Sequence, residues 1–463
     1  MLTIGDMRRL GRRDFLRVGS LALGGFSLPW LFPTAHAGTK LSAYGKPVTD
    51  KSVVFLFMHG GPSQFETFDP KMSAPEEIRS ATGAIRTAVP GLSFGSSFPK
   101  LAERANRLCI VRSFVPGNGN HDIKTIVGKD SFDANIGSAY ASAAGSSHPS
   151  NGLPTNCILF PRAVDPSAGP EQKGFGSFVA HGPFPPHTAP FQPDGTGTLQ
   201  KDMKLNIPLE RLDDRRSLLA AFDAAKAGLD DRFDHLDDAQ QKAFSLLLSN
   251  IGAAFDVSKE DPKIVAKYDT ANLYDVTKIN RKWNNWKHYT DNAKTLGKLM
   301  LLARRLVERG AGFVTVTTNF VWDMHADQNN ATMTEGMSYM APPFDHAVSM
   351  FLDDLKERGL EDRVLLVACG EMGRTPKINK NAGRDHWGHL GPLLLAGGGL
   401  PGGAVIGQST ADGGNPASDP VTIPNLIGTI LHTLFDVGQL RVMRGVSREL
   451  LTMADYAPIR GLI

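Results

Sequence analysis

Short, largely apolar runs recur along this chain between segments with helical periodicity. The runs occupy residues 53–58, 108–113, 156–160, 312–318, 363–368 and 391–396. A strand that is buried on both faces reads as such a run, and its alternation with helices is typical of a parallel sheet. We therefore expect an α/β fold whose mostly parallel central sheet carries helices on both faces.

Helices are expected between these runs. Residues 101–107, 344–358 and 423–437 have helical periodicity, and a further helix is expected to open at residues 117–122 and to run through Val127. These helices would cover the two faces of the sheet.

Two segments differ in character from the rest. Residues 162–200 are rich in Pro, Gly and Ser and predict a long loop over the surface. Residues 208–310 are charged and predict a helical insertion, clearest at 209–229, 237–255 and 296–309. We expect one α/β domain, residues 38–463, that contains this insertion.

The first forty residues look like an export signal. Arg12 and Arg13 precede a weakly apolar run that ends at Phe32, and residues 35–37 offer small residues at both specificity positions of a cleavage site. The run contains Pro29 and is shorter than the roughly twenty apolar residues of a membrane anchor. We expect residues 1–37 to be a twin-arginine signal peptide, with the twin-arginine translocase as partner and a periplasmic or secreted location.

The composition excludes several classes of protein. A net charge of +3, with 41% hydrophobic and 21% charged residues, gives no basic stripe for nucleic acid, and no second segment predicts a stable membrane span. Cys109 and Cys369 fall inside predicted strands and are expected to be buried packing residues. One disulfide through Cys157 stays open.

Polar side chains follow four of the predicted strands, at the points where the strands end. In strand order they are His59, Ser63, Glu66 and Asp69; Asn118, Asn120, His121 and Asp122; Asn319, Asp323, His325 and Asp327; and Glu371, Arg374, Asp385, His386 and His389. Such residues also favour loops for turn geometry. The carboxyl ends of parallel strands share one edge, however, so we expect one site there.

The residue types at this edge suit a divalent metal. In an extended segment Asp323, His325 and Asp327 would point the same way and could face one ion. Glu371, with Asp385 and His386 on the Gly-rich loop beyond it, adds oxygen and imidazole ligands. Mixed carboxylate and histidine ligands suit zinc, manganese or iron better than calcium, which prefers oxygen alone. We expect a divalent metal, with zinc favoured and manganese or calcium as alternatives.

The chain resembles a known family of exported bacterial proteins, the domain of unknown function 1501. The motifs that carry the resemblance are His59-Gly60-Gly61-Pro62-Ser63-Gln64-Phe65-Glu66-Thr67-Phe68-Asp69-Pro70-Lys71, Leu302-Ala303-Arg304-Arg305-Leu306-Val307-Glu308, Trp322-Asp323-Met324-His325, Gly370-Glu371-Met372-Gly373-Arg374-Thr375-Pro376 and Gly383-Arg384-Asp385-His386-Trp387. That family is similar in turn to the alkaline phosphatase and sulfatase superfamily, whose sheet carries one or two metals at the strand ends.

The resemblance implies a set of metal ligands. Asp323 and His325 resemble the pair that holds the first metal, and His386 resembles the late histidine that completes it. Glu371 stands where the superfamily has an Asp-His pair. Asp69 is expected to be the early acidic ligand, with Glu66 as the second choice.

The chain departs from the superfamily at the nucleophile. Superfamily enzymes place Ser, Thr or Cys after the second strand, but residues 118–121 read Asn-Gly-Asn-His. Either a metal-activated water attacks the ester, with Arg374 or His121 stabilising the developing charge, or Ser63 or Ser113 is the nucleophile. Ser63 has a competing interpretation as a turn or N-cap residue.

These observations predict an exported metal-dependent hydrolase of phosphate or sulfate esters. Its substrate would be a small or polymeric anionic ester. The alternative is a non-catalytic exported protein on the same fold that binds a metal or a glycan. A serine esterase that would use His59-Gly60-Gly61 as an oxyanion loop is disfavoured.

Overall fold

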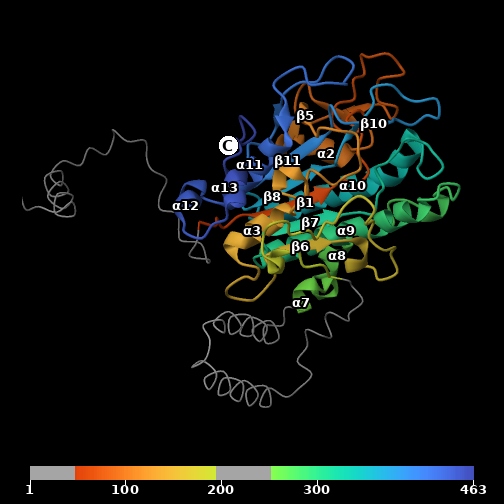
Figure 1. Cartoon of the computed structure of the whole chain (residues 1–463). Helices are drawn as coiled ribbons and strands as arrows, with labels where there is room; N and C mark the ends of the chain where they lie inside the picture. The colour runs from red at the N-terminus through yellow and green to blue at the C-terminus, as the bar shows by residue number, and fades with distance from the viewer. Residues whose placement is uncertain (1–46, 194–251) are drawn as a thin grey trace, which may run out of the picture. The chain divides into compact units, whose positions relative to one another are not determined.

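The computed structural model describes residues 47–193 and 252–463 (Figure 1). The expected signal peptide, the helix expected at 209–229 and most of the one expected at 237–255 lie outside the described residues.

A seven-stranded sheet forms the centre of the described chain, in the order β12-β4-β11-β8-β1-β7-β6. Its strands are β1 Ser52–Phe57, β4 Leu108–Val111, β6 Asn156–Leu159, β7 Phe313–Thr317, β8 Val364–Cys369, β11 Leu393–Gly397 and β12 Ala404–Ile406. Strand β11 is antiparallel to β4 and β8, and the other pairings are parallel. The prediction of a mostly parallel sheet is confirmed.

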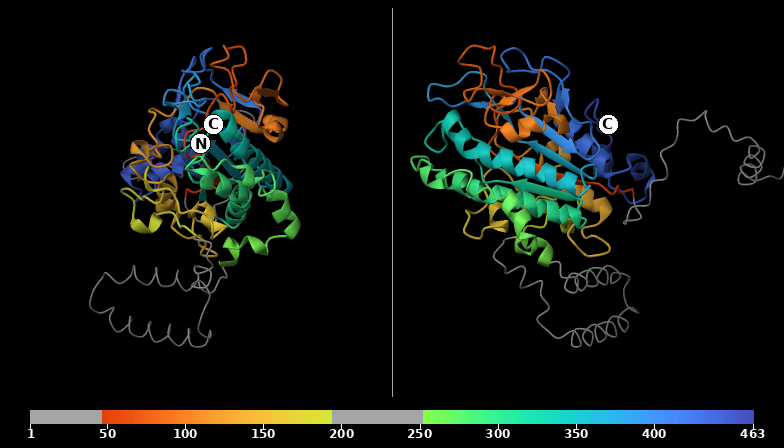
Figure 2. Two further views of the ribbon diagram at one scale, coloured as in Figure 1. Left: turned by 90° about the vertical axis from the view of Figure 1, so that its right-hand side faces the viewer. Right: turned by 180° about the vertical axis from the view of Figure 1, so that it is seen from behind.

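Alternate residues of the central strand β1 enter two separate cores. Val54 and Leu56 pack with helices α9 (Trp286–Glu308) and α10 (Met333–Glu357). Val53, Phe55 and Phe57 pack with α3 (Ile136–Ala144), α11 (Ile423–Leu434) and α13 (Arg448–Ala454). Figure 2 shows α9 and α10 lying together across one face of the sheet. Because both faces are covered, the strand is apolar at every position after Ser52.

Short elements complete the described chain. They are β2 Ala84–Arg86, β3 Ser93–Gly95, β5 Phe114–Val115, β9 Gly373–Arg374, β10 His386–Trp387, β13 Val421–Thr422, α2 Pro99–Glu103, α7 Gly252–Phe255, α8 Pro262–Tyr268, α12 Val437–Val442, and the 3-10 turns η1 Ala105–Arg107, η2 Lys129–Ser131, η3 Pro161–Ala163, η4 Pro186–Thr188, η5 Val257–Lys259 and η6 Val276–Lys278. Between residues 162 and 193 the chain forms a loop with brief turns, as predicted.

One predicted helix is wrong. The segment from Gly117 to Val127 forms turns and bends instead of a helix. Asn118 accepts a hydrogen bond at its side-chain Oδ1 from the backbone N–H of Asn120, at 2.9 Å. An asparagine side chain that binds the backbone two residues on competes with helical hydrogen bonding. His121 therefore lies on a loop and not in a helix.

The register brings the strand ends level. Phe57, at the end of β1, pairs with Thr317 of β7 and with Cys369 of β8. Leu393, which begins the antiparallel β11, pairs with Cys369 and also with Val111 at the end of β4. The four loops that follow β1, β4, β7 and β8 therefore leave the sheet at one edge.

Two further predictions concern membranes and cysteines. Within the described ranges, no helix combines the length and the apolar character needed to cross a membrane. Cys109, Cys157 and Cys369 are all buried and unpaired. The open option of a disulfide through Cys157 is therefore not realised.

Candidate metal centre

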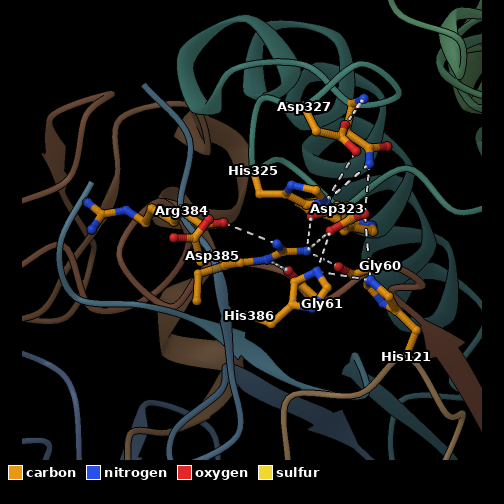
Figure 3. A network of polar contacts seen from close by, with 12 residues as sticks. Gly60, Gly61, His121, Asp323, His325, Asp327, Arg384, Asp385 and His386 are labelled. Atoms are coloured by element: carbon orange, nitrogen blue, oxygen red, sulfur yellow. Dashed lines mark hydrogen bonds and ion pairs between the residues drawn. The ribbon is translucent and has the colours of Figure 1, made fainter. Parts of the chain in front are cut away.

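Three donor side chains, those of His121, Asp323 and His386, come from three of these loops and lie together, with their candidate ligand atoms within 4.8 Å of one another (Figure 3). His121 Nε2 lies 3.1 Å from His386 Nε2, which lies 3.2 Å from Asp323 Oδ1. His121 Nε2 is 3.5 Å from Asp323 Oδ2. Zinc bonds of about 2.0–2.1 Å in a tetrahedron put neighbouring ligand atoms roughly 3.3 Å apart. The donor set and its spacing therefore fit a metal ion.

The group is buried on one side and open on the other. The Asp323 side chain is 3% exposed, whereas the His386 side chain is 34% exposed. A shallow depression of about 470 Å³ lies over the open side and is lined by residues 119–122, 174–175 and His386. A catalytic metal needs such an open side for water and substrate.

Glu371 supports His121 from the buried side. It is fully buried and accepts hydrogen bonds from the backbone N–H of Gly60, at 3.0 and 3.2 Å. Its Oε1 also lies 2.9 Å from His121 Nδ1. In metal sites a carboxylate commonly holds the second ring nitrogen of a histidine ligand in this way, which leaves the other nitrogen to the metal.

Gly60 is required for this arrangement. Its φ of +114° is unfavourable for residues with a side chain, and a Cβ there would lie 2.5 Å from the backbone nitrogen of Asp323. The loop after β1 can therefore approach the loop after β7 only because this residue is glycine.

Asp323 is the most heavily contacted residue of the group. Its Oδ1 accepts from Arg374 Nη2 at 2.6 Å, and its Oδ2 accepts from Asn330 Nδ2 at 2.8 Å and lies 3.1 Å from His325 Nε2. Burial alone would raise the pKa of Asp323, but the charge of Arg374 and the hydrogen bonds from His121, His325 and His386 hold that pKa well below its usual range. The carboxylate is therefore ionised.

The electrostatics favour a cation. Arg374 pairs with Asp323, whereas Glu371 contacts His121 and the Gly60 N–H, so the two carboxylates carry one negative charge more than the guanidinium of Arg374 balances. Burial lowers the pKa of His121, but hydrogen bonds with Asp323 and Glu371 outweigh it, and the pKa is raised overall. A metal that binds His121 would displace the proton held there.

Arg374, expected to stabilise the charge that develops on the ester, pairs with the carboxylate of Asp323. Its side chain is fully buried and donates to backbone carbonyls of Gly60, Gly61, Trp322 and Arg384 as well as to Asp323. It ties the loop after β1 to the loop after β7. Its contacts give it no access to a substrate in the depression.

Ser63 and Glu66 lie in a separate buried network. The Ser63 hydroxyl donates to Glu66 Oε2 and accepts from the backbone N–H of Phe65 at 3.2 Å. Glu66 pairs with Arg384 at 3.1 Å, and both side chains are fully buried. Ser63 thus has the contacts of a turn residue, and Ser113 is also fully buried.

The other two acidic residues predicted as ligands make contacts away from the donor triad. Asp69 accepts from the Ser409 hydroxyl and lies 3.3 Å from Lys71 Nζ and 3.6 Å from Arg112 Nε. Asp385 is exposed and accepts from Asn379 Nδ2 at 2.9 Å.

Two groups that hold the carboxylates of the centre were not predicted from the sequence, and a third residue was predicted in a different role. Asn330 and the backbone N–H of Gly60 hold the two carboxylates, and neither had been singled out for it. The Gly60-Gly61 pair after a strand was the available signal for the second. His121, expected to stabilise charge on the substrate, lies instead among the candidate metal ligands.

The edge of the sheet and its donor triad define an α/β protein with a candidate metal centre. A sequence model of the family described as "Protein of unknown function (DUF1501)" matches residues 50–448, so the chain belongs to that family. A search of curated proteins found no match.

Comparison with solved structures found distant similarity. A sulfatase from Pseudoalteromonas sp. is 12% identical, with 85% of this chain and 68% of that chain covered and a TM-score of 0.35. A phosphonate monoester hydrolase from Silicibacter pomeroyi is 11% identical, with coverages of 83% and 73% and a TM-score of 0.32. At these scores the likeness carries no argument about function.

Proposed function

We propose that this protein is an exported, metal-dependent hydrolase of phosphate or sulfate esters. The observation that carries the proposal is the convergence of His121, Asp323 and His386 beside an open depression. Two histidines and one carboxylate, with a position left open, are the ligand set of many catalytic zinc sites. The resemblance to the alkaline phosphatase and sulfatase superfamily supports the same reaction class.

The residues would divide the work as follows. A zinc ion held by the triad would polarise the ester and lower the pKa of bound water to about 7. Glu371 keeps His121 oriented through Nδ1, and Arg374 and His325 keep Asp323 oriented. In this arrangement Glu371 and His325, which the sequence suggested as ligands, would act through the residues they hold.

Water is the nucleophile that we favour. Ser63 and Ser113 are buried, and the Ser63 hydroxyl is committed to Glu66. The oxygen of water would bond to phosphorus or sulfur, the bond to the ester oxygen would break, and the alcohol would leave with a proton. Export rests on Arg12, Arg13 and the small residues at 35–37.

A binding protein is the second candidate, and one observation favours it. Among the residues that the structure describes, those lining the depression beside the triad include no arginine or lysine, and Arg374 is buried away from it. Any positive charge that an ester anion meets there would have to come from the metal.

Two measurements test these functions. Purified protein should contain about one zinc per chain and turn over an aryl phosphate, a phosphodiester or an aryl sulfate. His386→Ala should abolish both. His389→Ala should keep both, because His389 is an exposed residue on the same loop and its ring packs against that of Trp387. Bound zinc without turnover of any ester would select the binding protein, and absence of metal after zinc loading would refute the metal-dependent hydrolase and a metal-binding protein alike.

A further inference from the structure

Two depressions meet at the loop around Phe175, beside the metal centre. The first is the one over the triad, and the second, of about 860 Å³, extends away from it. Residues between Asn118 and Asp122 contribute to the lining of each depression, and Asp122 and Phe175 line both. We call this continuous surface the Phe175 groove.

The ring of Phe175 is held in a fixed position. It is half-buried, stacks on Phe320 with ring centroids 4.8 Å apart and lies 5.0 Å from the ring of His121. Gly174 and Gly176 flank it, and the φ of +134° at Gly176 is accessible mainly to glycine. The loop therefore presents one aromatic face at the mouth of the site without the entropy cost of ordering it on binding.

The polar lining of the groove mixes donors and acceptors. Away from the triad it contains Asn118, Asp122, Lys124, Lys129, Asp130 and Asp133. Three carboxylates against two ammonium groups give no excess of positive charge, and Lys124 Nζ already bonds to the carbonyl oxygen of Asn120 at 2.9 Å and to Asp122. Such a surface does not suit a polyanion.

Hydroxyl groups suit this lining better. Each hydroxyl donates one hydrogen bond and accepts others, so it can pair with carboxylate, amide and ammonium groups alike. An aromatic face beside such groups suits a ring with an apolar side and a polar rim. Each depression lies within the roughly 300–1,000 Å³ of small-molecule sites, so together they hold more than one ring.

We propose that the group carrying the ester is a carbohydrate chain, whose sugar rings cross Phe175 and reach Lys129 along the groove. The inference rests on the proposed function, because that function identifies the reacting group as an ester. The test below measures carbohydrate binding and does not depend on ester hydrolysis. The ester would lie at His121 and His386, and the neutral hydroxyls of the adjoining units would lie against Asp122 and Asn118.

The test is binding of zinc-loaded protein to an array of neutral, sulfated and phosphorylated oligosaccharides. We expect retention of oligosaccharides of several units, weakened roughly tenfold in Phe175→Ala and Phe175→Leu and kept in Phe175→Trp. Tyr274→Ala is the control, because Tyr274 is another half-buried aromatic residue that packs on Tyr339 outside the groove.

Each outcome decides between occupants. If Phe175→Leu binds as well as wild type, or if the protein binds phosphatidylglycerol vesicles but not glycans, the occupant is an acyl chain and the inference is overturned. Turnover of aryl esters without glycan binding would also overturn it while leaving the hydrolase standing. Glycan binding that depends on Phe175 without turnover of any ester would support the inference and refute the hydrolase.

Discussion

Asp323 links every part of the candidate centre, since its two oxygens contact two candidate ligands and three orienting side chains. Oδ1 faces Arg374 and His386, and Oδ2 faces His121, His325 and Asn330. Its charge is balanced in the protein by a single buried guanidinium. Removing that charge would leave Arg374 uncompensated.

The first prediction concerns this residue. Asp323→Asn should abolish zinc binding and lower the free energy of unfolding by about 3–5 kcal/mol, because it leaves a buried cation unpaired. Zinc competition with a chromophoric chelator and urea unfolding measure the two effects. Asp327→Asn is the control, since Asp327 lies 3.9 Å from His325 on the exposed side of the same loop. A stable Asp323→Asn protein that still binds zinc would contradict the assignment.

The second prediction separates a ligand from a residue that orients one. Glu371→Gln keeps an acceptor for the Gly60 N–H but loses the charge beside His121 Nδ1. If Glu371 acts through His121, zinc affinity should fall by about 10–100-fold and the zinc should still bind. Complete loss, equal to that of Asp323→Asn, would instead make Glu371 a direct ligand.

At the scale of elements, α10 positions α2 through one carboxylate. Asp345 of α10 accepts from the backbone N–H groups of Lys100 and Leu101 in the first turn of α2, at 3.0 and 2.8 Å. These N–H groups have no partner within the helix, so Asp345 supplies the cap that Phe98 does not. The contact joins two helices that are far apart in the sequence.

The third prediction is the pH dependence of this contact. Burial raises the pKa of Asp345 to about 6. The folded protein therefore holds a proton that the unfolded chain releases near pH 4, so this group's contribution to stability falls as the pH rises from 4 to 6. The loss amounts to at most about 3 kcal/mol. We expect the difference in the free energy of unfolding between Asp345→Asn and wild type, measured with urea, to favour the variant more at pH 7 than at pH 4.5.

A control on the same helix has the opposite sign. Burial alone would raise the pKa of Asp353, but its hydrogen bonds and ion pairs with Arg104 and Arg107 lower it. The contribution of Asp353 to stability is present above the pKa that this group has in the unfolded chain. It is lost as the pH falls through the lower pKa of the folded protein. Asp353→Asn should therefore cost stability at pH 7. Parallel profiles for the two variants would contradict the account.

At the scale of the whole molecule, the centre couples distant parts of the chain. Its donors come from loops at residues 121, 323 and 386, which meet only when β4, β7 and β8 lie in one sheet. The unfolded chain therefore lacks the site. A metal that binds only the folded state stabilises it by mass action.

The fourth prediction follows from this coupling. Zinc at about a hundred times its dissociation constant should stabilise the folded protein by about 2.7 kcal/mol and raise Tm, and a chelator should reverse the shift. Differential scanning fluorimetry with and without zinc measures it, with Asp323→Asn as the unresponsive control. An unchanged Tm in wild type would indicate that the folded chain does not assemble the centre.

The sheet, and the edge of it where the polar residues gather, could be predicted from the amino-acid sequence alone. A strand buried between two helical layers is apolar at nearly every position, so runs such as 53–58 and 363–368 are visible without any tertiary information. Level strand ends then follow from parallel pairing. Asp323 and His386 were expected at one centre for this reason.

The role of each polar residue at that edge depends on contacts between distant segments of the folded chain. Glu66 and Asp69 follow the same strand as Gly60, yet Arg384 and Arg112 pair with them away from the donor triad. His121 directs its Nε2 toward Asp323 and His386 because Glu371, 250 residues later in the chain, holds its Nδ1. A side chain's role at such an edge depends on its counter-charge, and that partner comes from a distant segment that local sequence does not reveal.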